Sequence, residues 1–289
     1  MQISLNGIKN LIKFFSSDDD TGSTNRIAKT FTALQKQKRK ALIPFITAGD
    51  PNPEITVQLM NQLVQSGANI IELGVPFSDP MADGPTIQRS SERALKHHVS
   101  LNDVLDMVAI FRKSDTNTPV VLMGYANPIE ALGYETFAAK AKDCGVDGVL
   151  IVDYPPEESN EWVRCLDQHG IDTIFLLSPT TPQERIRQVA GMAKGYIYYV
   201  SLKGVTGASH LDLQDVSAMV GQLRNYISIP IGVGFGIRDG ATAKAVAGLA
   251  DAVVVGSRII EEIEKSPDAE LLSNVGDLLS ALRKAIDEN

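Results

Sequence analysis

Cysteine is scarce in this chain of 289 residues, which holds only Cys144 and Cys165. Two thiols are too few for a disulfide framework, and both lie in segments with helical periodicity. We therefore expect buried free thiols and a reducing, cytoplasmic setting. None of the four histidines has metal-ligand spacing to either cysteine, so the sequence predicts no metal site.

A surplus of positive charge is also missing. The formal net charge of -8 argues against nucleic acid as the main partner, because nucleic acid favours a basic face. An acidic average still permits a small anionic substrate, since local backbone N–H groups can bind phosphate. The chain is 44% hydrophobic and 21% charged, which is typical of a soluble globular protein with a large core.

The first 25 residues lack the features of a targeting segment. The stretch "LNGIKNLIKFF" has helical spacing of its apolar residues, but it is too short to span a membrane and has no cleavage site. A basic amphipathic helix could lie on a membrane surface. A short helix that docks on the core or on a neighbouring chain is the interpretation we favour. The polar stretch "SSDDDTGSTN" then predicts a linker between an extension, residues 1–25, and one domain, residues 26–289.

Short apolar segments alternate with amphipathic ones along this domain. Predicted strands are Ala41–Thr47, Asn69–Gly74, Pro119–Met123, Gly148–Asp153, Asp172–Leu177, Gly195–Ser201, Ile229–Gly234 and Ala252–Gly256. Predicted helices are Glu54–Ser66, Leu101–Lys113, Tyr134–Cys144, Glu157–His169, Pro182–Ala193, Leu213–Tyr226, Asp239–Ala247 and about Ala269–Ala285. Continuously apolar strands are typical of a parallel sheet that is covered on both faces.

Eight such strand–helix units predict an α/β protein, a (β/α)₈ TIM barrel, with an extra N-terminal helical segment. A doubly wound open sheet is the alternative. Against it, the glycine in "ITAGDP" after the first strand belongs to no dinucleotide-binding fingerprint. In a barrel of this class the active site forms at the carboxyl ends of the strands, so residues there are the candidates for function.

Glu72 is the lone acid within an apolar strand. Loss of solvent there should raise its pKa towards neutrality, which suits a general acid or base. The alternative is a structural Glu72 paired with a basic side chain. Asp83 follows in "PFSDPMADGP", a loop that three prolines stiffen, where it could face Glu72. Alternatively, Asp83 could have only a structural role in a turn, because a glycine follows it. We attribute Asp79 to turn formation.

Glycine-rich loops follow the last three predicted strands: "SLKGVTGA", "GVGFGI" and "VVVGSRI". Glycine allows close backbone approach to a ligand, and the loops after strands seven and eight form the usual phosphate site of barrels. Turn formation alone is the alternative reason for these glycines, and we attribute Lys203 to solvent. No lysine that could form a Schiff base ends a strand. The pattern predicts acid–base chemistry on a phosphorylated, partly apolar substrate, without metal or cofactor.

These motifs resemble those of the tryptophan synthase α subunits. The shared segments, in order, are "ALIPFITAGDP", "IELGVPFSDPMADGPTIQ", "YANPI", "GVDGVLIVDYPPEES", "YVSLKGVTGA", "GFGIRD" and "VVGSRI". The resemblance covers about residue 26 to the C-terminus, and the first 25 residues lie outside the usual family pattern. It implies a lyase that cleaves indole-3-glycerol phosphate to indole and glyceraldehyde 3-phosphate in tryptophan biosynthesis.

The resemblance also implies roles for individual residues. Glu72 matches the family's general acid/base, Asp83 the acid that hydrogen-bonds the indole N–H, and Tyr198 a tyrosine near the reacting carbon. Positions that match pocket residues are Phe45, Ile87, Tyr125 and Asp153. Positions that match the phosphate-binding segment are Thr206, Gly207, Gly234, Phe235, Gly236, Gly256 and Ser257.

The family resemblance implies a partner as well, a pyridoxal-phosphate-dependent β subunit that receives indole within an α₂β₂ tetramer. The loop that carries Asp83 and the stretch "GYANPIEALGY" are where we expect it to dock. Two alternatives remain open. The chain could be a stand-alone lyase with the same site, or a catalytically silent regulatory barrel, against which the presence of Glu72 and Asp83 weighs.

Overall fold

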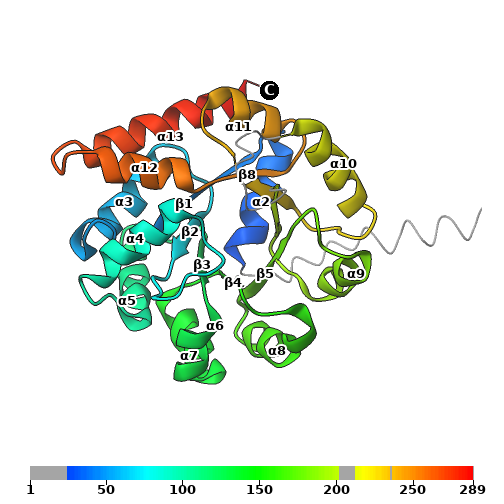
Figure 1. Ribbon diagram of the computed structural model, residues 1–289, viewed down its shortest axis with the longest axis horizontal. Coiled ribbons are helices and arrows are strands. Elements are labelled where there is room, and N and C mark those ends of the chain that lie inside the picture. The colour runs from blue at the N-terminus through cyan, green and yellow to red at the C-terminus, as the bar shows by residue number, and fades with distance from the viewer. Residues whose placement is uncertain (1–24, 202–211, 235, 289) are drawn as a thin grey trace, which may run out of the picture.

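Eight parallel strands close into a barrel in the computed structural model, which describes residues 25–201, 212–234 and 236–288 (Figure 1). The strands are β1 (Ala41–Thr47), β2 (Ile71–Gly74), β3 (Val120–Gly124), β4 (Gly148–Ile151), β5 (Asp172–Leu177), β6 (Ile197–Val200), β7 (Ile231–Gly234) and β8 (Ala252–Val255). Each strand pairs with its neighbours in sequence, and β8 pairs with β1 from Ala41↔Ala252 to Pro44↔Val255. The predicted TIM barrel is confirmed, and the open-sheet alternative is wrong.

The described helices surround the barrel in an outer layer, apart from α2, which lies across one end (Figure 1). They are α2 (Arg26–Lys36), α3 (Pro53–Gln65), α4 (Pro85–Leu95), α5 (Leu101–Phe111), α6 (Ala126–Leu132), α7 (Tyr134–Cys144), α8 (Asn160–Gln168), α9 (Gln183–Met192), α10 (Leu213–Leu223), α11 (Gly240–Ala247), α12 (Ser257–Lys265) and α13 (Leu271–Asp287), with a 3₁₀ turn η1 at Pro156–Glu158. Local signals fix several starts. Asp239, for example, caps α11 in a reciprocal capping box with Thr242.

Helices α4 and α6, which follow β2 and β3, were not predicted. Helix α4 begins at Pro85, a favourable first helical position, directly after Gly84. Its side chains are mostly polar, and only Ser90, Ser91 and Ala94 are buried, so it gives a weak apolar pattern. Helix α6 has seven residues and ends at Gly133, which has a φ of 85°. A helix this short offers too few turns for a periodicity to show.

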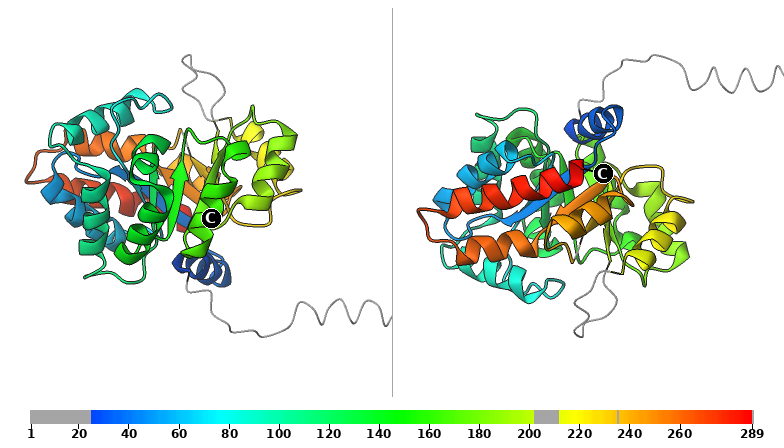
Figure 2. Two further views of the ribbon diagram at one scale, coloured as in Figure 1. Left: turned by 90° about the horizontal axis from the view of Figure 1, so that it is seen from below. Right: turned by 90° about the horizontal axis from the view of Figure 1, so that it is seen from above.

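The barrel interior is filled by a compact apolar cluster that α2 completes from one end. Ile27, Phe31 and Leu34 of α2 pack against inward-facing strand residues such as Ile43 and Tyr196. Figure 2 shows α2 across one end of the barrel. Because this end is plugged, the interior is accessible only from the carboxyl ends of the strands, where a barrel's site forms.

The description begins at Asn25, whose side chain accepts a hydrogen bond from Ile27 N at 2.8 Å and so caps α2. Apart from Asn25, the predicted N-terminal extension lies outside the described residues, and its separation from the barrel stays a prediction. Among residues 25–201, 212–234 and 236–288, no helix has the length and apolar character that crossing a bilayer requires.

Candidate active site

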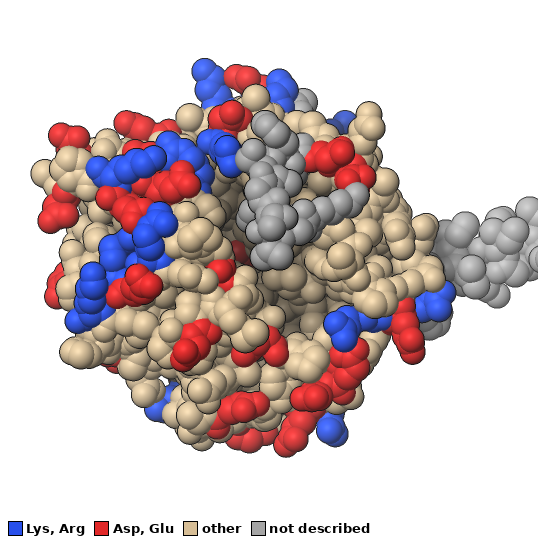
Figure 3. All heavy atoms as spheres, in the orientation of Figure 1, with Lys and Arg blue, Asp and Glu red and all other residues tan. Residues whose placement is uncertain are grey.

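The candidate site lies at the carboxyl ends of the strands, on the face that Figure 3 presents. That face is hollowed near its centre, and uncharged side chains form much of the hollow's border (Figure 3). A small pocket there is lined by Phe45, Thr47, Gly74, Val75, Asp83, Ile87, Ser91, Met123, Gly124, Tyr125 and Val152. The pocket therefore unites four predicted residues from three successive strand–helix units: Phe45, Asp83, Ile87 and Tyr125.

Glu72 sits in β2, paired in register with Phe45 of β1, and its side chain has no solvent exposure. Burial raises the pKa of Glu72 to about 8, although a hydrogen bond from Tyr196 acts in the opposite direction. The other carboxyl oxygen, Oε2, has no hydrogen-bond partner among the described residues. No salt bridge of Glu72 is found among the described residues either, so the alternative of a structural ion pair is not supported there. Glu72 has the pKa of a proton donor and acceptor at neutral pH.

Tyr196 is a site residue that the sequence analysis missed. Its hydroxyl donates to Glu72 Oε1 at 2.5 Å, and its ring lies 6.0 Å from that of Phe31 in α2. The two positions Tyr196 and Tyr198 face the same side of β6, since strand side chains alternate. The alternation was therefore the available signal, but the resemblance drew attention to Tyr198 alone.

We expect Tyr196→Phe to raise the apparent pKa of Glu72 by about one unit. The reason is that the lost hydrogen bond favours the ionised carboxyl by roughly 1 kcal/mol, and one pKa unit corresponds to 1.36 kcal/mol. The pH dependence of kcat/KM for indole release measures this change, with Tyr199→Phe, on the opposite face of β6, as the matched control. Identical pH profiles for Tyr196→Phe and the wild type would contradict it.

Asp83 is held at the pocket by Tyr125, which follows β3. The Tyr125 hydroxyl donates to Asp83 Oδ2 at 3.1 Å and accepts from Ala82 N at 3.0 Å, while its ring stacks on Phe77 at 5.0 Å. Burial raises the pKa of Asp83, and the Tyr125 hydrogen bond lowers it. Asp79 is exposed and accepts from the Ser78 hydroxyl at 2.7 Å, which agrees with a turn role. Of the two acids in this loop, Asp83 lines the pocket and Asp79 does not.

The charges of both acids, Glu72 and Asp83, act on the phenol of Tyr198. Burial raises the pKa of Tyr198, and the charges of Glu72 and then Asp83 raise it further. Gly234, at the end of β7, lies against this phenol: a Cβ atom there would lie 2.7 Å from Tyr198 Cζ. Glycine at this position therefore gives Tyr198 the room it occupies.

Gly234→Ala should lower kcat/KM for indole release at least tenfold, because the added methyl group must displace the Tyr198 ring, which the family resemblance places near the reacting carbon. Gly221→Ala is the matched control, since a Cβ atom at Gly221 in α10 meets nothing within 4 Å. Steady-state rates of both variants, with circular dichroism to verify folding, provide the measurement. A folded Gly234→Ala enzyme with wild-type kcat/KM would refute this packing role.

The predicted phosphate-binding residues fall partly within the described chain. Gly236 has a φ of 76°, a backbone conformation that glycine adopts readily. Gly256 precedes the first residue of α12, Ser257, where backbone N–H groups lack helical partners and attract anions. Thr206, Gly207 and Phe235, like Lys203, lie outside the described residues.

Two further contacts position the loops around the pocket. Asp153, exposed after β4, accepts a hydrogen bond from Ala126 N at 2.9 Å and so fixes the start of α6. Arg93 of α4 binds the buried Asp50 through both carboxylate oxygens, at 2.6 and 2.9 Å, and binds Glu264 of α12 at 2.9 Å. Figure 3 shows charges of both signs intermixed over this side of the face. The helix after the Asp83 loop is thereby tied to the helix that starts at Ser257.

A closed barrel with a buried carboxyl whose pKa is about 8, and a second acid in its mouth, is typical of an enzyme that uses acid–base chemistry. A family model described as "Tryptophan synthase alpha chain" matches residues 31–284. The chain is 71% identical to the tryptophan synthase alpha chain of Nitrosospira multiformis over 263 residues, which are 91% of this chain and 94% of that protein. It is 69% identical to that of Nitrosomonas europaea, with 91% and 96% of the two chains covered.

Solved structures agree with these relatives. The alpha subunit from Legionella pneumophila superposes with a TM-score of 0.86 at 49% identity, covering 92% of this chain and 100% of that one. An aminoacrylate-bound tryptophan synthase structure from M. tuberculosis matches with a TM-score of 0.81 at 32% identity, covering 91% and 100%. This chain belongs to the tryptophan synthase alpha chain family. It is a lyase that cleaves indole-3-glycerol phosphate to indole and glyceraldehyde 3-phosphate.

Proposed function

We propose that Glu72 carries the proton transfers of this cleavage. The observation that supports this most is a fully buried carboxyl with a pKa of about 8 and one oxygen, Oε2, free of partners among the described residues. Cleavage of the carbon–carbon bond needs a proton delivered to indole C3 and a proton removed from the adjacent glycerol hydroxyl. The bond electrons then return to the ring as indole leaves, and the hydroxyl carbon becomes the aldehyde. A carboxyl with a pKa of about 8 is mostly protonated at neutral pH but ionises readily, so it can serve in both transfers.

Asp83 takes the complementary role in this proposal. Protonation at C3 places positive charge on the ring nitrogen, and a carboxylate that accepts from N1–H stabilises it. Tyr125 positions Asp83 through the 3.1 Å hydrogen bond, and Phe45 and Ile87 provide apolar walls for the indole ring. Tyr198 has a supporting role near the reacting carbon. The backbone at Gly234, Gly236, Gly256 and Ser257 binds the phosphate, together with Thr206, Gly207 and Phe235.

The direct test is indole release from indole-3-glycerol phosphate by the purified full chain, with no cofactor added. We expect measurable release by the chain alone. No release, with or without a β subunit, would favour the catalytically silent barrel.

We further propose that this chain works with a pyridoxal-phosphate-dependent β subunit in an α₂β₂ tetramer. Indole is small and apolar, so direct transfer to a second site prevents its loss. Met81, at 87% exposure in the loop that carries Asp83, is the most exposed large apolar side chain among those described and lies at the mouth where such a partner docks. Docking there biases the loop towards the arrangement that presents Asp83.

We expect the cognate β subunit to stimulate indole release at least about tenfold, which corresponds to about 1.4 kcal/mol of coupling. Met81→Glu should reduce this stimulation, because it places a charge in the contact. Ile110→Glu, on the outer helix α5 where the native side chain is 49% exposed, is the matched control. Sedimentation of the mixture reports complex formation. Full activity of the chain alone, with no complex, would support the stand-alone lyase instead.

A further inference from the structure

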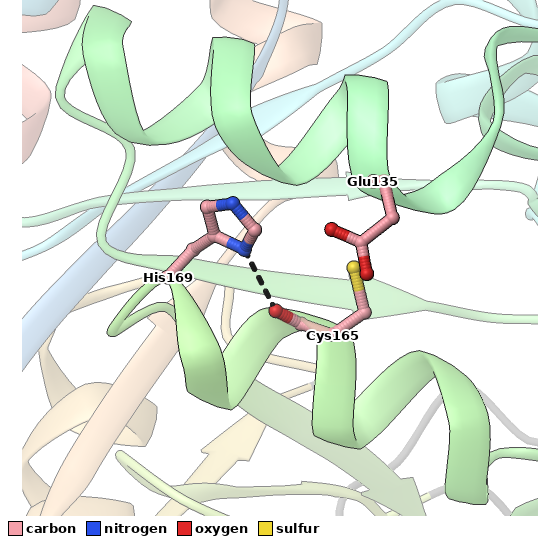
Figure 4. Close-up of side chains that lie close together, drawn as sticks. All are labelled: Glu135, Cys165 and His169. Atoms are coloured by element: carbon pink, nitrogen blue, oxygen red, sulfur yellow. Dashed lines mark hydrogen bonds between the residues drawn. The ribbon is translucent and has the colours of Figure 1, made fainter.

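Three side chains of metal-binding type meet on the outside of the barrel, away from the pocket. Glu135 lies in the first turn of α7, Cys165 lies in α8, and His169 is the C-cap of α8. One potential ligand atom from each lies within 4.8 Å of the other two. Figure 4 shows the Glu135 carboxylate and the Cys165 thiol pointing toward each other between the two helices, with the His169 ring beside them.

The three groups form a mixed donor set. A thiol, an imidazole and a carboxylate together suit Zn²⁺ and related divalent transition ions, whereas Mg²⁺ and Ca²⁺ prefer oxygen alone. Cys165 and His169 are four residues apart on one helix, which places them on one face. This interval escaped the sequence analysis because its third partner comes from another helix, 30 residues earlier.

The contacts of His169 decide which of its ring nitrogens can bind an ion. His169 Nδ1 lies 2.9 Å from the carbonyl oxygen of Cys165, and because a carbonyl only accepts, Nδ1 carries the ring proton and Nε2 keeps its lone pair. Burial raises the pKa of the Cys165 thiol to about 11, with further contributions from the charge and hydrogen bond of Glu135 and the charge of Glu161. The negative charges of Glu135 and Glu161, which contribute to this shift after burial, also attract a cation.

We propose that Glu135, Cys165 and His169 bind a divalent transition-metal ion of the Zn²⁺ class, with water as the fourth ligand. Bonds of about 2.0–2.3 Å in a tetrahedral site place ligand atoms about 3.5 Å apart, so separations of up to 4.8 Å must shorten by at most about 1.3 Å. Glu135 is exposed and His169 is half-buried, and rotation of these two side chains brings them to the fixed sulfur of Cys165. As the metal–sulfur bond forms, the thiol proton leaves to solvent.

The bound ion would join α7 to α8 beside an existing contact, the Phe137 and Trp162 rings at 5.6 Å. Binding to the native state alone stabilises it, since the unfolded chain does not bring the three ligands together. None of the three side chains lines the pocket, so the ion has no part in indole release.

Titration of the metal-free full chain with Co²⁺ tests the site, because cobalt bound to thiolate absorbs in the near ultraviolet. We expect one equivalent to give this band, and Zn²⁺ to abolish it by competition. Cys165→Ser should remove the band, while His169→Gln and Glu135→Gln should weaken Co²⁺ binding at least tenfold. Cys144→Ser, which changes the chain's other cysteine, is the matched control and should keep the band.

Thermal unfolding gives an independent readout. Zn²⁺ should raise the Tm of the wild type and of Cys144→Ser, but not that of Cys165→Ser or His169→Gln, while EDTA leaves indole release unchanged. If Cys165→Ser does not fold, His169→Gln and Glu135→Gln still test the site, because these two side chains are half-buried and exposed and their substitution should not prevent folding. Two results would overturn the proposal. One is the absence of the cobalt band in the wild type. The other is a Co²⁺ affinity of His169→Gln and Glu135→Gln equal to that of the wild type.

Discussion

Glu72→Gln is expected to lower kcat for indole release by about 10³-fold or more, with KM changed by no more than a few-fold. Glutamine keeps the shape of the side chain and fits the same buried place in β2, but it cannot transfer a proton. General acid–base catalysis contributes about 10²–10⁴-fold in enzymes, and here one carboxyl serves two transfers. Steady-state kinetics with indole-3-glycerol phosphate measures both constants.

The control for this substitution is Glu54→Gln, which makes the same chemical change at an exposed position in α3 and should leave kcat unchanged. A wild-type kcat in folded Glu72→Gln would remove Glu72 from the mechanism. Loss of activity through unfolding is distinguishable, since circular dichroism and denaturant midpoints report it separately.

The stability of Glu72→Gln should depend on pH in a defined direction. The pKa of Glu72 is about 8 in the native state, against an ordinary value of 4.5. Between these pH values the native protein retains a proton that the unfolded chain releases, so this group's contribution to the free energy of unfolding falls as pH rises. Glutamine does not titrate, so the variant does not lose stability in this way as pH rises. Its stability relative to wild type should therefore be higher at pH 8 than at pH 5, by an amount on the order of a few kcal/mol.

Asp83→Asn should lower kcat/KM for indole release by about 10²–10³-fold. The asparagine side chain can still meet the Tyr125 hydroxyl, but it has no negative charge to oppose the positive charge that forms on the indole ring. Loss of one preorganised electrostatic partner in an enclosed site costs about 2.7–4 kcal/mol in transition-state stabilisation. Rates measured at several pH values separate this effect from the altered titration of the pocket.

Asp79→Asn provides the matched comparison, because Asp79 belongs to the same loop but is exposed and contacts Ser78 rather than the pocket. Its kcat/KM should stay within about twofold of wild type. Equal losses in Asp79→Asn and Asp83→Asn would indicate that the loop's overall charge matters, for example in docking a partner, and would contradict a specific role for Asp83.

The sequence by itself determined the barrel and the position of its principal acid. Eight continuously apolar strands that alternate with amphipathic helices are local patterns. A strand that is buried on both faces has the same apolar sequence whichever strands it pairs with. Glu72 interrupts one such strand, so its burial followed from its neighbours alone. Helix α4 escaped this reasoning because few of its side chains are buried, and a helix held by polar contacts leaves little apolar periodicity.

Only the tertiary structure decided which side chains meet. Tyr196 reaches Glu72 across 124 residues, Tyr125 holds Asp83 across 42, and Glu135 meets Cys165 from a neighbouring helix. Such pairs depend on strand register and on the order in which the barrel closes, and no local pattern in the chain encodes a distance between separate elements. The sequence placed acids at one end of a barrel, and the closure of β1 onto β8 turned them into a pocket with defined partners.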